Sequence, residues 1–157
     1  MKRKTVTVVA GVLIAAASLA VAASALTLPK GYQKWRKSRQ HIVNDRKSLF
    51  YGIHYTYVDA RAMKTFEKGG PYPEGSRFVV EQFTILDKGG KPVPGKKSMI
   101  VMMKKDKRFK DTGGWQFAGF TAVGRPSGLD PVKNCFECHL KEAADRDYVI
   151  SKYSEFK

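Results

Sequence analysis

Alternation between hydrophobic and polar positions is the clearest pattern in the middle of the chain. Four stretches rich in aromatic and β-branched residues lie between turns that contain glycine or proline, and this pattern predicts β-strands. They cover residues 50–58, 76–86, 98–104 and 115–123, with a loop expected over 87–92. Short strands joined by such turns favour a mostly antiparallel sheet.

Short helices are expected before and between these strands. Residues 28–36 begin with a turn and predict a short helix, followed by a polar connection in which His41 lies at the surface. Asp59 is suited to cap a helix over residues 60–67, which the following pair of glycines would end. The chain is therefore expected to have an α+β fold, a mostly antiparallel sheet with a few short helices.

The strongest chemical signal is Cys135-Phe136-Glu137-Cys138-His139, near the C-terminus. Asp130 and Pro131 have the pattern of an N-cap followed by proline at the first helical position, so a C-terminal helix is expected to carry this motif. On a helix the two cysteines lie one turn apart on the same face. The spacing C-x-x-C-H is typical of c-type haem attachment, in which the thiols bond to the haem vinyl groups and the histidine ligates the iron.

Two other interpretations of the motif are weaker. A zinc site needs four ligands, and the chain has no second cysteine pair and only His41 and His54 as further histidines. A redox dithiol of the thioredoxin type would open a helix within a βαβ unit, a pattern that is not predicted here. We therefore expect one covalently attached haem c, bound through Cys135 and Cys138, with His139 as the iron ligand.

The N-terminal stretch has the features of an exported protein. Three basic residues precede an apolar run over residues 6–23, and Ala23-Ser24-Ala25 has the small-x-small pattern of a cleavage site. We expect a signal peptide over residues 1–25 and a haem domain over 26–157. Because the apolar run is close to membrane-spanning length, an uncleaved anchor is the alternative. In either case the folded part is expected in the periplasm.

The chain is strongly basic. Its 29 Lys and Arg residues against 14 Asp and Glu residues give a formal net charge of +15. Such a surface can attract an acidic redox partner or anionic lipid headgroups. Nucleic acid is the other class of partner for this charge, but an exported haem protein is not expected to bind it, and the lysines are scattered along the chain.

Several further motifs follow one another in a recognisable order. They are Gly31-Tyr32 to Trp35, His54 to Asp59, Tyr72-Pro73-Glu74-Gly75, Gly113-Gly114-Trp115, and the C-terminal motif with Asp147-Tyr148-Val149. In this order they resemble the cytochrome P460 family, which includes the related cytochromes c-prime-beta. The resemblance implies a β-rich domain, often a homodimer, with one haem, a proximal histidine and an open distal side. Members of the family handle nitric oxide or hydroxylamine.

Two departures from the family pattern bear on the chemistry. Hydroxylamine-oxidising members carry a lysine bonded to the haem edge, at a position that falls on Val80 here. The resemblance therefore implies an uncrosslinked haem, as in the c-prime-beta branch, with Phe78 and Val80 lining the pocket. The position of a distal arginine in those members falls on His54. An imidazole there could contact a bound diatomic ligand, relay protons or ligate the iron, whereas the alternative is a strand histidine that faces solvent or is satisfied by a backbone carbonyl.

Other candidate residues are less clearly selected by the sequence. Asp130 is favoured as a helix cap, with a proton-relay role at the distal pocket as the second interpretation. An arginine could pair with the haem propionates, but nothing selects among three candidates, Arg61, Arg77 and Arg125. Methionines could be axial ligands, although on strands they more often fill the core; the candidates are Met99, Met102 and Met103.

These observations predict a periplasmic mono-haem c-type cytochrome whose open distal site binds nitric oxide or a similar small ligand, to capture or detoxify nitrogen oxides. The alternative is an electron-transfer cytochrome with six-coordinate iron, its sixth ligand being His54 or a methionine. Oxidation of hydroxylamine is a third hypothesis, and it is weaker because Val80 replaces the lysine. Whether the protein turns over a substrate is not decided by the sequence.

Overall fold

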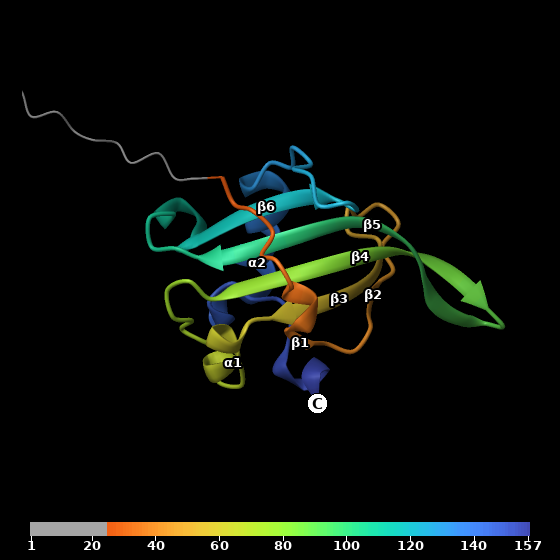
Figure 1. The fold of residues 1–157 in the computed structure, drawn as a ribbon, viewed down its shortest axis with the longest axis horizontal. Coiled ribbons are helices and arrows are strands. Elements are labelled where there is room, and N and C mark those ends of the chain that lie inside the picture. Colours follow the sequence, from red (N-terminus) through yellow and green to blue (C-terminus); the bar gives the residue numbers. More distant parts are fainter. Residues whose placement is uncertain (1–24) are drawn as a thin grey trace, which may run out of the picture.

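The computed structural model describes residues 25–157 and is built around one sheet of six strands (Figure 1). The strands are β1 (Arg36–Lys37), β2 (His41–Val43), β3 (Gly52–Val58), β4 (Arg77–Lys88), β5 (Lys91–Lys105) and β6 (Trp115–Thr121). Their order is β1-β3-β4-β5-β6, with β2 pairing with β3 beside β1, and every pair is antiparallel. The predicted antiparallel sheet is therefore confirmed.

The helices are short and lie outside the sheet. They are α1 (Ala60–Phe66) and α2 (Glu137–Ala143), with a π-helical turn at Val132–Phe136 and 3₁₀ turns at Tyr32–Lys34, Lys110–Thr112, Ala144–Arg146 and Tyr153–Phe156. Asp59 caps α1 as expected, because its carboxylate accepts a hydrogen bond of 2.8 Å from the backbone N–H of Ala62. The expected helix over residues 28–36 is only a 3₁₀ turn.

The hairpin between β4 and β5 differs from the sequence-based expectation of a loop over residues 87–92. The two strands stay paired as far as Lys88 and Lys91, across the turn Gly89-Gly90. Both glycines have positive φ, +63° and +77°, which a two-residue hairpin turn requires and glycine adopts without strain. Figure 1 shows this hairpin extending beyond the rest of the sheet.

The segment around His41 also differs from expectation. Instead of a polar connection it forms β2, which places His41 opposite His54 on β3. Three residues are too few to show an alternating pattern, and the strand exists because β3 offers an unpaired edge there. His41 itself is exposed.

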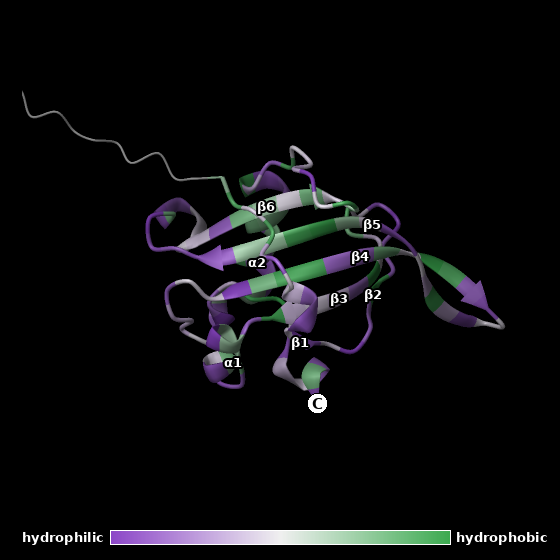
Figure 2. Cartoon of the chain, in the orientation of Figure 1, coloured by the Kyte–Doolittle hydropathy of each residue, from purple (hydrophilic) through white to green (hydrophobic). Residues whose placement is uncertain are grey.

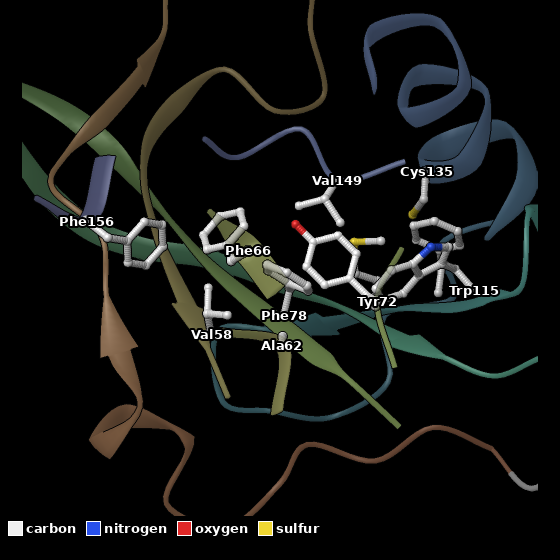
Figure 3. Packing of buried hydrophobic residues seen from close by; sticks show 11 residues of the cluster. Val58, Ala62, Phe66, Tyr72, Phe78, Trp115, Cys135, Val149 and Phe156 are labelled. Atoms are coloured by element: carbon white, nitrogen blue, oxygen red, sulfur yellow. The ribbon is translucent and has the colours of Figure 1, made fainter. Parts of the chain in front are cut away.

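Each face of the sheet packs against a different part of the chain. On one face Tyr32 from the N-terminal segment packs with Tyr57, Val79 and Phe120. On the other face the C-terminal segment and α1 contribute to a cluster rich in aromatic rings (Figure 3). Figure 2 shows the hydrophobic residues concentrated in the central parts of β4 and β5, where both faces are covered.

The C-terminal segment packs on the aromatic cluster through residues that include Cys135 and Val149. The ring of Tyr72 meets Phe78 at 5.2 Å and Trp115 at 5.7 Å, both in edge-to-face geometry. Aromatic pairs in this geometry stabilise the fold by more than the burial of their apolar area alone. Figure 3 shows Cys135 pointing from its helix towards this cluster, with Val149 on the same side.

The expected signal peptide, and the alternative of a membrane anchor over residues 6–23, lie outside the described residues apart from Ala25. Within residues 25–157, no helix is both long and apolar enough to cross a membrane.

Candidate functional site

A cavity of about 830 Å³ lies between the sheet and the C-terminal segment. This volume is within the range of about 300–1,000 Å³ that is usual for small-molecule and cofactor sites. The sheet lines it with His54, Thr56, Phe78, Val80, Val101 and Phe117. Cys135, Cys138 and His139 of the C-x-x-C-H motif line the cavity from the side of the C-terminal segment.

Strand register explains why Val80 faces this cavity. Val80 is paired with Thr56 on β3 and with Val101 on β5, and all three line the cavity. Side chains alternate between the faces of a strand, so its neighbour Val79 points to the other face and is fully buried. Val80 is only partly buried although it lies in a central strand. The sheet therefore presents an apolar surface to the cavity at this position.

The two cysteines differ in their environment. Cys135, in the π-helical turn, is buried, whereas Cys138, in α2, is exposed at the edge of the cavity. Burial raises the pKa of the Cys135 thiol to about 11. A reactive dithiol needs a lowered thiol pKa, so this environment argues against the redox-dithiol interpretation.

His139 is held in one orientation by its surroundings. Its Nδ1 lies 2.6 Å from the backbone oxygen of Tyr148, and Phe117 packs edge-on against its ring at 4.9 Å. With Nδ1–H donating to this oxygen, Nε2 is the nitrogen left to bind a metal. Burial lowers the pKa of His139, which favours the neutral imidazole that ligates metals.

His54 lines the cavity from β3 and has an unsatisfied nitrogen. Its Nε2 is buried and, within the described part of the chain, has no hydrogen-bond partner. Burial also lowers the pKa of His54, so the imidazole is neutral near pH 7. A buried polar atom without a partner is costly unless a bound group satisfies it. His54 is therefore positioned to contact a ligand within the cavity.

Asp130 lies at the start of the C-terminal helical segment, away from the cavity lining. One oxygen of its carboxylate accepts hydrogen bonds from the backbone N–H groups of Val132 (2.9 Å) and Lys133 (3.0 Å). These are the contacts of a helix-capping residue, and they lower the pKa of Asp130.

The arginines suggested for the propionates lie elsewhere. Arg77 forms an ion pair with Asp59 at 2.9 Å, and Arg61 donates a hydrogen bond to the backbone oxygen of Glu74. Neither of these arginines lines the cavity, and Arg125 does not line it either. Of the candidate methionines, Met102 and Met103 are among the residues at the cavity and Met99 is not. Met102 is paired with Val79, however, and its side chain packs in the cluster on the opposite face, whereas Met103 is paired with Phe78 on the cavity face.

Sequence reasoning missed Arg146, which does line the cavity. Its Nε is buried and lacks a hydrogen-bond partner among residues 25–157, although its outer nitrogens contact Asp145 and the backbone oxygen of Glu142. Lys152 lines the same region. Arg146 follows His139 by seven residues, and this closeness to the motif was the available signal.

These residues fit a haem. Two thiols and the imidazole of His139 line one wall, and apolar side chains of β4 and β5 line the facing wall. Two polar atoms that have no hydrogen-bond partner among the described residues, His54 Nε2 and Arg146 Nε, border the space. The fold and cavity thus define a small β-sheet protein with a cofactor-sized, histidine-bearing cavity.

The chain belongs to the cytochrome P460 family, because the family model described as Cytochrome P460 matches residues 29–151. This confirms the family resemblance predicted from the sequence, and the family implies a haem cofactor. A comparison with curated proteins finds no match.

Proposed function

We propose that this protein is a periplasmic mono-haem c-type cytochrome that binds nitric oxide or a similar small ligand at an open distal site. Cys135 and Cys138 would attach the haem, and His139 Nε2 would be its proximal ligand. The observation that carries this proposal is that these three residues share one cavity with His54 and Val80.

A haem held by Cys135, Cys138 and His139 would supply an iron centre able to bind a diatomic ligand. The chain's own residues determine which ligand enters. Phe78, Val80 and Val101 make the sheet side of the cavity apolar, which disfavours charged ligands. His54 Nε2 supplies a neutral hydrogen-bonding atom to the ligand, and Arg146 supplies a cation for a haem carboxylate.

An uncrosslinked haem, as in the c-prime-beta branch, is part of this proposal. A crosslink of the kind that the hydroxylamine-oxidising members have needs a nucleophilic amine at position 80, and Val80 offers only methyl groups to the cavity. Capture or detoxification of nitrogen oxides therefore fits this site better than oxidation of hydroxylamine.

Export, partners and assembly complete the proposal. The basic N-terminal pattern followed by an apolar run supports export to the periplasm. The net charge of +15 supports contact with an acidic redox partner, and the family resemblance supports a homodimer.

The competing function is electron transfer with six-coordinate iron. His54 Nε2 favours it specifically, because this nitrogen has no hydrogen-bond partner within residues 25–157 and an imidazole that faces a haem pocket can ligate the iron as well as contact a ligand. The two functions require different states of the same side chain, so one spectrum separates them.

The test is the visible spectrum of the purified ferrous protein before and after addition of nitric oxide or carbon monoxide. Open-site binding predicts broad bands that change on addition of either gas. Sharp α and β bands that neither gas changes would contradict the ligand-binding proposal and support electron transfer. A strongly red-shifted ferrous Soret band would show instead that the haem is modified.

A further inference from the structure

The backbone that contacts His139 has an unusual conformation. Asp147 and Tyr148 are consecutive and have φ values of +49° and +64°, and within residues 25–157 they are the only residues other than glycine with positive φ. Residues with a Cβ rarely adopt this left-handed backbone conformation. Such a turn persists only where its surroundings fix it, and it presents the Tyr148 oxygen to His139 Nδ1.

Three groups from distant parts of the chain hold Asp147 in this conformation. Its Oδ1 is 2.5 Å from Lys105 Nζ on β5, and its Oδ2 accepts a hydrogen bond of 2.8 Å from the backbone N–H of Tyr72. Its carbonyl oxygen accepts a hydrogen bond of 2.9 Å from Trp115 Nε1. Both partners in the ion pair are largely buried, with side-chain exposures of 16% for Lys105 and 14% for Asp147.

Two glycines, Gly113 and Gly70, leave room for the turn because they have no side chain. A Cβ at Gly113 would lie only 2.2 Å from the ring of Tyr148, and one at Gly70 would lie 3.0 Å from Asp147. Lys105 Nζ also donates to the backbone oxygen of Gly113 at 3.3 Å. One ammonium group therefore connects the loop before β6 to the turn beside His139.

We propose that Lys105 and Asp147 are positioning residues that set the strength of the bond between His139 and the haem iron. The inference rests on the proposed function, in which His139 is the proximal ligand. By fixing the Tyr148 oxygen against Nδ1, the ion pair keeps the Nδ1–H hydrogen bond short. A strong hydrogen bond at this nitrogen makes Nε2 a more basic ligand. Neither residue contacts the haem in this proposal; both act through the Tyr148 carbonyl.

The test uses the complete haem-loaded protein and resonance Raman spectroscopy of the iron–histidine stretch. The spectrum is recorded on the five-coordinate ferrous protein, or on the photoproduct of its carbon monoxide complex if a sixth ligand is present. Lys105→Gln and Asp147→Asn are expected to shift the stretch to lower frequency. Lys105→Arg, which retains the cation, is expected to restore most of the original frequency.

Lys97→Gln is the matched control. Lys97 is also on β5 and lies 2.5 Å from a buried carboxylate, that of Glu81, but this pair is on the face of the sheet opposite the cavity. Its loss removes the same charge without touching the turn, so the stretch should stay at the wild-type frequency. The double variant Lys105→Gln/Asp147→Asn should match Asp147→Asn alone, because both residues act through one turn.

The outcomes separate this inference from the function on which it rests. A wild-type band that neither Lys105→Gln nor Asp147→Asn moves would overturn the inference alone. Equal shifts in Lys97→Gln and Lys105→Gln would also overturn it, since a general loss of charge or stability would then explain both. A wild-type protein whose iron lacks a histidine ligand would overturn the proposed function and the inference together. If Asp147→Asn does not fold, the comparison of Lys105→Gln, Lys105→Arg and Lys97→Gln still decides.

Discussion

His41 on β2 and His54 on β3 are directly opposed across the strand pair, with ring centroids 6.3 Å apart. Both line the cavity, but the first is exposed, whereas the Nε2 atom of the second is buried. The ring of Phe50 packs edge-on against His54 at 6.4 Å and helps to exclude water from it. The pair therefore provides two similar imidazoles of which only one is suited to contact a bound ligand.

Replacing His54 by leucine is expected to weaken the binding of nitric oxide to the ferrous protein. A net hydrogen bond contributes about 1 kcal/mol, so the dissociation constant should rise roughly fivefold. His41→Leu is the matched control and should leave the dissociation constant unchanged. Stopped-flow association and dissociation rates measure both. An unchanged affinity and spectrum in His54→Leu would remove this residue from the site, and conversion of a six-coordinate spectrum into a five-coordinate one would identify it as the axial ligand.

Val79 and Val80 are neighbours on β4, so the same substitution at each position compares a core residue with a residue that lines the cavity. Val79→Ala removes two buried methyl groups from the face opposite the cavity and should lower the free energy of unfolding by about 2 kcal/mol. Val80→Ala enlarges the cavity instead, so it should cost less stability and alter the rate of carbon monoxide binding. Urea unfolding and flash photolysis measure the two effects. Identical behaviour of the two variants would contradict the assignment of Val80 to the cavity wall.

The two cysteines make a direct prediction about haem attachment. One haem per chain should stay bound to the wild-type protein on a denaturing gel and give the pyridine haemochrome spectrum of a haem with two thioethers. Cys135→Ser and Cys138→Ser should each retain one thioether and shift the haemochrome α band to longer wavelength. The double variant should lose its haem on the gel. Haem that dissociates from the wild-type protein under denaturing conditions would contradict c-type attachment.

Local sequence patterns were sufficient for much of the fold and for one wall of the cavity. The alternation in β3 and β4 predicted the sheet, and it correctly placed Phe78 and Val80 on one face. The cysteines and His139 were selected because their spacing over five residues is itself the signal, and the structure places all three at one cavity. Asp59 was recognised as a cap for the same reason. In each case the signal lies within a short continuous stretch of the sequence.

The remaining features depend on contacts between distant residues. Strand β2 exists because β3 has a free edge, and no pattern in its three residues indicates this. Lys105 and Asp147 are 42 residues apart, and the turn that they fix contacts His139 through a backbone oxygen, which carries no sequence signature. Arg146 lies in the 3₁₀ turn Ala144–Arg146 directly after α2, and it borders the cavity because this segment packs over the sheet.

The face of the sheet opposite the cavity contains a buried carboxylate. Glu81 accepts hydrogen bonds from the hydroxyl groups of Tyr32 (2.7 Å) and Tyr57 (3.0 Å), and Lys97 Nζ lies 2.5 Å from it. Burial tends to raise the pKa of Glu81, but these partners outweigh it and hold the pKa below its ordinary value. The charged form is therefore favoured in the folded state more than in the unfolded state.

This lowered pKa predicts a loss of stability in acid. A carboxylate whose pKa is lower in the folded protein contributes stability above its unfolded pKa, near 4.3 for glutamate, and loses that contribution as the pH falls through the folded pKa. Glu81→Gln should therefore be less stable than the wild type at pH 7, and the difference should shrink as the pH falls below about 4. Urea unfolding midpoints from pH 7 to pH 3 measure this, with the exposed Glu67→Gln as control. A difference that stays constant over this range would show that Glu81 contributes through packing alone.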